Sequence, residues 1–324
     1  MTKSRAPWWS AAFFRAYVVT MRPYLLFVSG AAGLVGLSFA PGLSGGRALA
    51  AFFPLFLSYG FGQALTDCFQ TDTDALSAPY RPLVRGIVTK RQVMTTSLVA
   101  LVAVVLVLAV LNPWMLLFGA LAVVGLATYT PLKRTWWGGP PWNSWIVALL
   151  PIMGRLADKG STPSDALANA PGPPAFLFAV VAVFFAYMNF VVMGYFKDIS
   201  ADRASGYNTF PVAFGWRAAA VYGDLTAAVA ALFSVAVVLA VGPGVVPVAL
   251  LCAGLAFHVS AQVRMHRTRD EAATGRPIAD GVRALVLFAL AMALANRPDW
   301  WPWMIPFYIF FELALRFRPA EGQV

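Results

Sequence analysis

Val93–Leu111 reads VMTTSLVALVAVVLVLAVL and Trp114–Thr130 reads WMLLFGALAVVGLATYT, with only Asn112-Pro113 between them. Neither run contains a charged residue, and each is close to the roughly 20 residues that a helix needs to cross a bilayer. Asn-Pro is a turn signal, so the chain is expected to reverse direction between the runs. This stretch predicts two antiparallel membrane-spanning helices.

Similar apolar runs recur along the rest of the chain. Three further runs are shorter, at Asn143–Ala157, Val282–Asn296 and Trp301–Leu315. Together the runs predict an all-α bundle of ten transmembrane helices, or nine if the last two shorter runs do not both cross. The remaining long runs are Tyr17–Ala40, Ala48–Thr66, Ala175–Phe196, Ala218–Val241 and Gly244–Gln262.

The overall composition supports a membrane protein and excludes several other classes. Of 324 residues, 60% are hydrophobic and 12% charged, whereas soluble domains have about 45–50% apolar and about 25% charged residues. Disordered chains are polar and poor in aromatics, and two distant cysteines, Cys68 and Cys252, do not make a disulfide scaffold. The net charge of +10 is explained by basic cytoplasmic loops, so nucleic acid is not expected as a partner.

The basic residues also predict the orientation of the chain in the membrane. Most fall on the side of the N-terminus, and the opposite loops hold only Arg47, Arg155, Lys159 and Arg297. The positive-inside rule therefore places the N-terminus and the long polar loops in the cytoplasm, in a multi-pass protein of the inner or plasma membrane. No shift in composition divides residues 1–324 into two domains. Residues 1–16 are expected to lie at the interface, and residues 301–324 to form an extra helix and a tail.

Two acidic clusters follow apolar runs on the same predicted side. On one helix, Asp67, Gln70 and Asp74 would share a face, whereas Asp72 would point away. Asp198 and Asp202 are four residues apart and would also share a face. Opposed carboxylates repel unless a cation lies between them, and Mg²⁺ binds carboxylates together with substrate phosphates. The alternative is that both clusters are solvated helix ends.

Basic and polar residues near these clusters could bind an anionic substrate. Guanidinium groups match phosphate oxygens in a bidentate manner, although the positive-inside rule explains basic residues here equally well. Asn189 lies about two turns before Asp198 and is a candidate for a cavity wall. The basic candidates are Arg81, Arg85, Lys133, Arg134 and Lys197.

Two motifs in this arrangement resemble those of the UbiA-type intramembrane prenyltransferase superfamily. The first family motif, Asn-Asp-x-x-Asp-x-x-x-Asp followed by Arg-Pro, aligns with Thr66-Asp67-x-x-Gln70-x-x-x-Asp74 and Arg81-Pro82. Thr66 replaces an Asn and Gln70 replaces an Asp. The second motif is better kept, as Lys197-Asp198-Ile-Ser-Ala-Asp202-Arg203, followed by Gly206 and Thr209-Phe-Pro211. Tyr129-Thr-Pro-Leu-Lys133-Arg134 and Arg22-Pro23 also resemble the family, which covers roughly residues 17–300.

The resemblance implies a fold, a reaction and a set of site residues. The fold would be a helical bundle around a central cavity open to the cytoplasm and to lipid. Mg²⁺ would be held by Asp67, Gln70, Asp74, Asp198 and Asp202, and Lys197 would join the four aspartates as catalytic residues. A prenyl diphosphate would be ionised and its prenyl group transferred to an aromatic or lipid acceptor. The substrate-binding set would be Thr66, Gln70, Arg22, Arg81, Arg85, Lys133, Arg134, Arg203, Asn189, Tyr129 and Tyr195.

Two other functions remain open from the sequence. A terpene cyclase on the same scaffold would ionise the same diphosphate but let the chain capture its own cation. A non-catalytic carrier would use polar groups near the bilayer midplane, often in interrupted and repeated helices. The carboxylates lie at the ends of apolar runs, which counts against the carrier.

Overall fold

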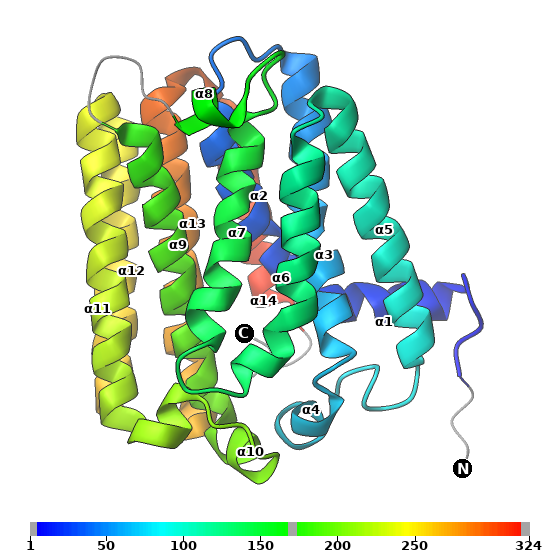
Figure 1. Cartoon of the computed structure of the whole chain (residues 1–324). Helices are drawn as coiled ribbons and strands as arrows, with labels where there is room; N and C mark the ends of the chain where they lie inside the picture. Colours follow the sequence, from blue (N-terminus) through cyan, green and yellow to red (C-terminus); the bar gives the residue numbers. More distant parts are fainter. Residues whose placement is uncertain (1–4, 168–173, 319–324) are drawn as a thin grey trace.

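The protein is a bundle of long helices with short helices and loops at both ends (Figure 1). This computed structural model describes residues 5–167 and 174–318, and within these ranges it contains no strand. Nine of the ten apolar runs each coincide with one long helix, and the tenth, Tyr17–Ala40, is broken at Arg22 so that only its later part forms a long helix. These helices are α2 (Pro23–Ser38), α3 (Gly45–Asp67), α5 (Lys90–Leu111), α6 (Met115–Lys133), α7 (Gly139–Arg155), α9 (Ala175–Tyr195), α11 (Phe210–Val241), α12 (Val245–Arg267), α13 (Gly275–Asn296) and α14 (Trp301–Arg316).

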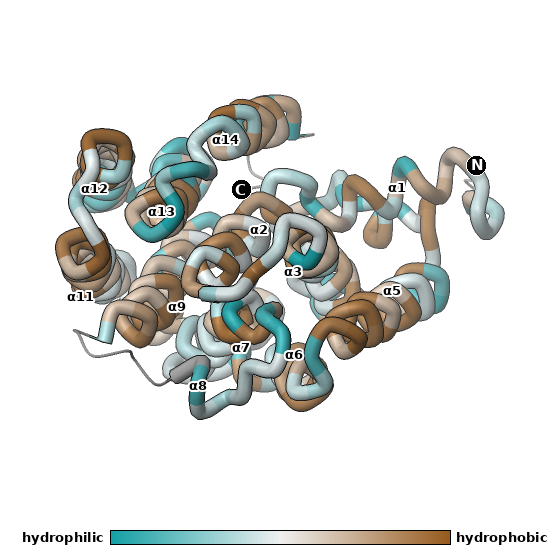
Figure 2. Tube along the Cα trace, turned by 90° about the horizontal axis from the view of Figure 1, so that it is seen from above, coloured by the Kyte–Doolittle hydropathy of each residue, from teal (hydrophilic) through white to brown (hydrophobic). Residues whose placement is uncertain are grey.

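The outer helices present apolar side chains to their surroundings. Val99, Val110 and Leu232 are all more than half exposed, and Figure 2 shows hydrophobic colour along the helices at the rim of the bundle. Seven helices in the described ranges are long and apolar enough to cross a membrane, or eight if the bent pair of α1 (Ala11–Met21) and α2 is one span. The chain is therefore a multi-pass integral membrane protein.

The predicted reversal of the chain at Asn112-Pro113, between α5 and α6, is confirmed. Thr89 and Gln92 form a reciprocal capping box that starts α5. At its other end, Asn112 donates to the carbonyl oxygens of Leu156 (2.9 Å) and Ser161 (2.8 Å) and accepts from the backbone of Trp114 (3.1 Å). The Asn side chain thus closes the turn before α6 and ties it to the end of α7.

Helices α2 and α7 bring their backbones together at two glycines. A Cβ on Gly36 would lie 2.0 Å from the carbonyl oxygen of Pro151, and a Cβ on Gly154 would lie 2.6 Å from that of Gly33. Small residues allow such backbone contact between membrane helices. Substitution of Gly36 would therefore push the two helices apart.

The short helices place the polar segments at one end of the bundle. α1 meets α2 at a bend of 56° and lies across the bundle in Figure 1. At the bend, Arg22 has φ of 53°, a left-handed conformation that costs energy in a residue other than glycine. At the lower end of Figure 1 are α4 (Thr71–Ser77) and α10 (Ile199–Ala204), which contact each other. The remaining short helices are α8 (Pro163–Leu167), η1 (Phe196–Asp198), η2 (Glu271–Thr274) and η3 (Pro298–Trp300).

One expectation about local structure is wrong. Asp67, Gln70 and Asp74 do not share the face of a continuous helix, because α3 ends at Asp67 and α4 begins at Thr71. Gln70, with φ of −123° and ψ of 18°, is the residue before α4. The sequence contains neither Gly nor Pro at this point, so no local signal marks the break.

Candidate functional site

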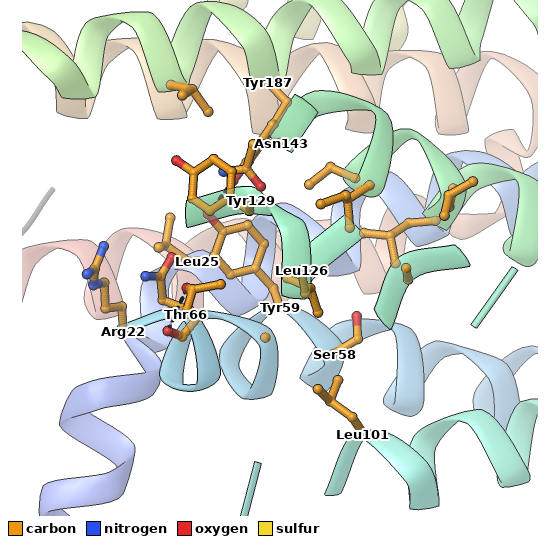
Figure 3. A pocket seen from close by; sticks show the side chains of 18 of the residues that line it. Arg22, Leu25, Ser58, Tyr59, Thr66, Leu101, Leu126, Tyr129, Asn143 and Tyr187 are labelled. Carbon is orange, nitrogen blue, oxygen red and sulfur yellow. Dashed lines mark hydrogen bonds between the residues drawn. The ribbon is translucent and has the colours of Figure 1, made fainter. Parts of the chain in front are cut away.

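A cavity of about 180 Å³ runs between α3, α5, α6, α7 and α9. One end is lined by charged and amide groups and the other by aliphatic side chains. In Figure 3, Arg22 and Thr66 lie to one side of Tyr59, with Leu126 and Leu101 to the other. The polar end is formed by Arg22, Gln63, Thr66, Gln70, Asp74, Arg81, Lys133, Lys197 and Asp198, and the apolar part includes Leu55, Leu101, Leu108, Leu126, Leu150 and Met153.

Tyrosines separate the two parts of the cavity. The Tyr59 and Tyr187 hydroxyls are 2.6 Å apart, and Asn143 donates to Tyr187 over 3.2 Å. Tyr129 and Tyr195 also line the cavity, as predicted for both. The electron-rich faces of such rings attract cations. Tyr59 and Asn143 were not identified from the sequence, where nothing distinguishes them from packing residues.

Asp67 is bonded to basic and amide side chains rather than facing the cavity. Arg22 donates to both carboxylate oxygens (2.9 and 3.2 Å), and Gln63 donates to Oδ1 over 2.7 Å. Asp67 is only 2% exposed and is not among the residues that line the cavity. In this arrangement it fixes the guanidinium of Arg22, which does line it.

Asp74 and Arg81 form the next ion pair. Arg81 binds Asp74 directly, and its Nη1 is 3.7 Å from Asp67. Burial raises the pKa of the Asp74 carboxyl, Arg81 opposes this, and the nearby charge of Asp67 adds to it. The ionised form of Asp74 therefore depends on the cations around it.

Gln70 stands where the first UbiA-type motif has an aspartate, and a lysine binds its side chain. Lys133 donates to Gln70 Oε1 over 2.9 Å, and its ammonium lies 5.4 Å from the ring centre of Tyr207 and 5.8 Å from that of Tyr195. Lys133 is buried and lines the cavity. Lys133 therefore places a positive charge near the end of α3.

The second acidic motif contributes one cavity-facing carboxylate and one structural one. Asp198 lines the cavity, is half-buried, and has no hydrogen bond or ion pair within the described ranges. Asp202 is fully buried and accepts from Thr73 (3.2 Å) and Thr209 (3.1 Å). Those hydroxyls connect α10 to α4 and to the start of α11. Thr209 belongs to the second motif as it was aligned, whereas nothing in the sequence singles out Thr73.

Comparison with known proteins identifies the family of the chain. The sequence model of the UbiA prenyltransferase family matches residues 25–279, which include both acidic motifs. The chain belongs to the UbiA prenyltransferase family.

Several UbiA-related proteins are similar over most of their length. A protein of Natronomonas pharaonis named digeranylgeranylglyceryl phosphate synthase is 33% identical over 205 residues, 63% of this chain and 70% of its own. One of the same name from Thermococcus kodakarensis is 28% identical over 223 residues, 66% of this chain and 74% of its own.

Solved structures of UbiA homologues have the same fold. The apo structure of a homologue from Aeropyrum pernix has a TM-score of 0.68 at 21% identity, covering 81% of this chain and 94% of that one. A homologue from Archaeoglobus fulgidus, bound to GPP and Mg²⁺, has a TM-score of 0.61 at 17% identity, covering 86% and 99%. The helical bundle of this chain is therefore UbiA-like.

Not every predicted site residue lies at the cavity of this UbiA chain. Asn189 does not line it, because its side chain donates to Gly223 O (2.8 Å) on α11 and accepts from His258 (3.1 Å) on α12. Arg85 and Arg203 are exposed and also absent from the lining. Arg134 lies outside it, where it pairs with Asp72 over 3.0 Å.

A glutamate from a distant loop supports the second motif. Glu271 accepts from the backbone N of Ser200 (3.0 Å) and from its hydroxyl (2.5 Å). The negative charge thus lies at the start of α10, where a helix stabilises an anion. Glu271 is about 70 residues from the motif, so no spacing could have connected them.

The donor atoms at the polar end suit a hard divalent cation. Asp74, Gln70 and Asp198 line the same cavity and carry the oxygen ligands that Mg²⁺ prefers. The Asp198 carboxylate has no direct partner within the described ranges, whereas Arg81 binds Asp74 and Lys133 donates to Gln70 Oε1. Across residues 5–167 and 174–318 there is no group of three His, Cys, Asp or Glu side chains close enough to hold an ion. An ion here would therefore be completed by oxygens from a substrate or water, as is usual for Mg²⁺.

Proposed function

We propose that this UbiA-family protein is a Mg²⁺-dependent prenyltransferase that moves a prenyl group from a prenyl diphosphate to the hydroxyl of a lipid. The observation that carries the proposal is the division of one cavity into a cationic end and an aliphatic end. A prenyl diphosphate has the same division between head and tail.

The chain's own groups support breaking the bond between the prenyl C1 and the diphosphate oxygen. The diphosphate leaves with the electron pair, and Arg22, Arg81 and Lys133 stabilise the charge that develops on it. The faces of Tyr59 and Tyr129 stabilise the allylic cation, and aliphatic walls exclude water from it. The acceptor oxygen then bonds to C1 and releases its proton to the departing diphosphate. Mg²⁺ at Asp74, Gln70 and Asp198 would supply further charge to the leaving group.

The names of the relatives support a lipid acceptor over an aromatic one. Digeranylgeranylglyceryl phosphate synthase denotes a product in which prenyl groups are carried by glyceryl phosphate. Homologous structures contain GPP or DMAPP with Mg²⁺, which supports the donor class and the ion.

The first test of this function is product analysis in nanodiscs. With Mg²⁺, geranylgeranyl diphosphate and a prenylated glyceryl phosphate, we expect an ether product and one diphosphate released per transfer, and loss of both on chelation. Without the acceptor, we expect little release of diphosphate. A cyclic hydrocarbon or terpene alcohol formed without acceptor would contradict the proposal and favour a cyclase, and uptake of an unchanged solute would favour a carrier.

We further propose that ten helices cross the membrane as one domain, with α1 on the surface and the cavity's polar end facing the cytoplasm and open to lipid. Support comes from α2, α7 and α14, which run with the seven longer spans, and from Val123, a cavity residue that is 40% exposed.

Cysteine labelling checks this topology. In a background lacking Cys68 and Cys252, Ser200→Cys should react with a membrane-impermeant maleimide only after cells are permeabilised. Lys159→Cys, at the opposite end, should react in intact cells. Labelling of Ser200→Cys in intact cells would reverse the orientation.

A further inference from the structure

Helix α14 lies outside the family match, which ends at residue 279, yet polar contacts hold it to the bundle. Arg283 on α13 donates to both oxygens of Glu312 (2.8 and 3.0 Å), and Tyr308 donates to Glu312 over 2.9 Å. Asp280 accepts from the same arginine over 3.1 Å. α14 also contacts α2. These contacts fix the orientation of α14 beside the first spanning helix.

A groove between α13 and α14 combines positive charge with an apolar wall. Its lining is Arg283, Tyr308, Ile309, Glu312, Leu313, Arg316 and Arg318. Glu312 is committed to Arg283, whereas Arg316 is exposed and has no hydrogen bond or ion pair within the described ranges. Ile309 and Leu313 are 52% and 42% exposed. Guanidinium groups beside aliphatic surface suit an amphiphile with a phosphate head.

The groove is close to the polar end of the main cavity. Helix α2, which begins directly after Arg22, packs against α14, and the ring centres of Phe27 on α2 and Phe311 on α14 are 6.0 Å apart. Arg22 and Arg81 line the main cavity, and Arg318 lines the groove. A lipid with its head in the groove would therefore lie near the cavity without sharing the cations that face the donor diphosphate.

We propose that Arg316 and Arg318 bind the phosphate of the lipid acceptor. The inference rests on the proposed function, because an acceptor built on glyceryl phosphate carries a second anion. Two anions repel in one site, so the acceptor phosphate needs cations of its own. The groove supplies them at a surface that lipid reaches, and α14 adds this site to the bundle that matches the family.

The binding test uses retention of lipid by the full chain in phosphatidylcholine nanodiscs, read by native mass spectrometry without donor. The probes are geranylgeranylglyceryl phosphate and the same lipid lacking the phosphate. Arg316→Gln should weaken retention of the phosphate lipid about tenfold, the effect of one charge-assisted hydrogen bond, and Arg316→Gln with Arg318→Gln should weaken it further. Arg267, at the end of α12, is exposed and makes no side-chain hydrogen bond or ion pair within the described ranges, and Arg267→Gln should leave retention unchanged.

Kinetics separate this inference from the proposed function. Arg316→Gln should raise the acceptor KM about tenfold and leave the donor KM unchanged. Equal retention by wild type and both variants, or equal retention of the two lipids by wild type, would overturn the inference. Displacement by an equal concentration of inorganic phosphate would also overturn it, because a free anion would then suffice. Arginine-dependent retention without any prenyl transfer would leave the lipid site standing and overturn the proposed function.

Discussion

Asp198→Asn is expected to lower prenyl transfer by more than about a hundredfold while leaving the protein folded. Asp198 lines the cavity, and its side chain makes no hydrogen bond or ion pair within the described ranges. Its replacement by an amide of similar size therefore breaks no direct contact, although it removes a negative charge near Lys197, Arg81 and Lys133. The variant loses a carboxylate that could bind a divalent ion. Substitution of residues that only support metal ligands often lowers metal affinity or activity 10–100-fold, so loss of a ligand should cost more. Turnover should be measured together with Mn²⁺ affinity by electron paramagnetic resonance, and both should fall.

Asp72→Asn is the matched control for this change. Asp72 lies in the first acidic cluster but pairs with Arg134 and accepts from Tyr207 (3.3 Å) at an exposed position outside the cavity. Exposed ion pairs contribute little, so activity should stay within about threefold of wild type and Mn²⁺ affinity should not change. Wild-type turnover in Asp198→Asn, or equal losses in the two variants, would contradict the site assignment.

Arg81→Gln is expected to lower transfer by about a hundredfold, the usual cost of removing one donor that stabilises developing negative charge. Arg81 also stands between Asp74 and Asp67, so its removal takes away the direct ion-pair partner of Asp74 and leaves Asp67 paired with Arg22 alone. The loss should appear in donor binding as well as in turnover, measured by calorimetry with a non-hydrolysable prenyl thiodiphosphate.

Arg85→Gln tests the same loop four residues later. Arg85 was predicted to bind substrate, but it is exposed and does not line the cavity. We expect donor affinity within about threefold of wild type. If Arg85→Gln weakened donor binding as much as Arg81→Gln, bulk positive potential rather than direct contact would account for both residues.

The sequence predicted the helices well because a bilayer requires long apolar segments. Nine of the ten apolar runs became one helix each, including the short run at Trp301–Leu315, which is α14. Asp74, Gln70, Arg81, Lys133 and Asp198 line one cavity, as the resemblance of the two motifs implied, and their roles in binding metal and substrate stay predictions.

The sequence did not predict the features that depend on contacts between distant segments. The break after Asp67 carries no glycine or proline, and tertiary contacts of α4 with α10 determine it. Glu271 reaches Ser200 from another loop. Asn189 was expected at the cavity from helical position, but it faces α11 and α12, where four polar partners satisfy its amide. Helical spacing defines a face without telling which neighbour that face meets.

The backbone contact of α2 with α7 at Gly36 and Gly154 makes the cavity mechanically asymmetric. At these two glycines no side chain stands between the helices, so a rotamer change there cannot widen the gap between α2 and α7. On the opposite side of the cavity, Val105 on α5 and Val123 on α6 line it and are partly exposed. The cavity can therefore widen on this side when α5 and α6 move apart into fluid lipid. Bulkier isoprenoid tails would therefore be accommodated by displacement of α5 and α6, and the stiffness of the surrounding bilayer becomes part of how the protein discriminates chain length.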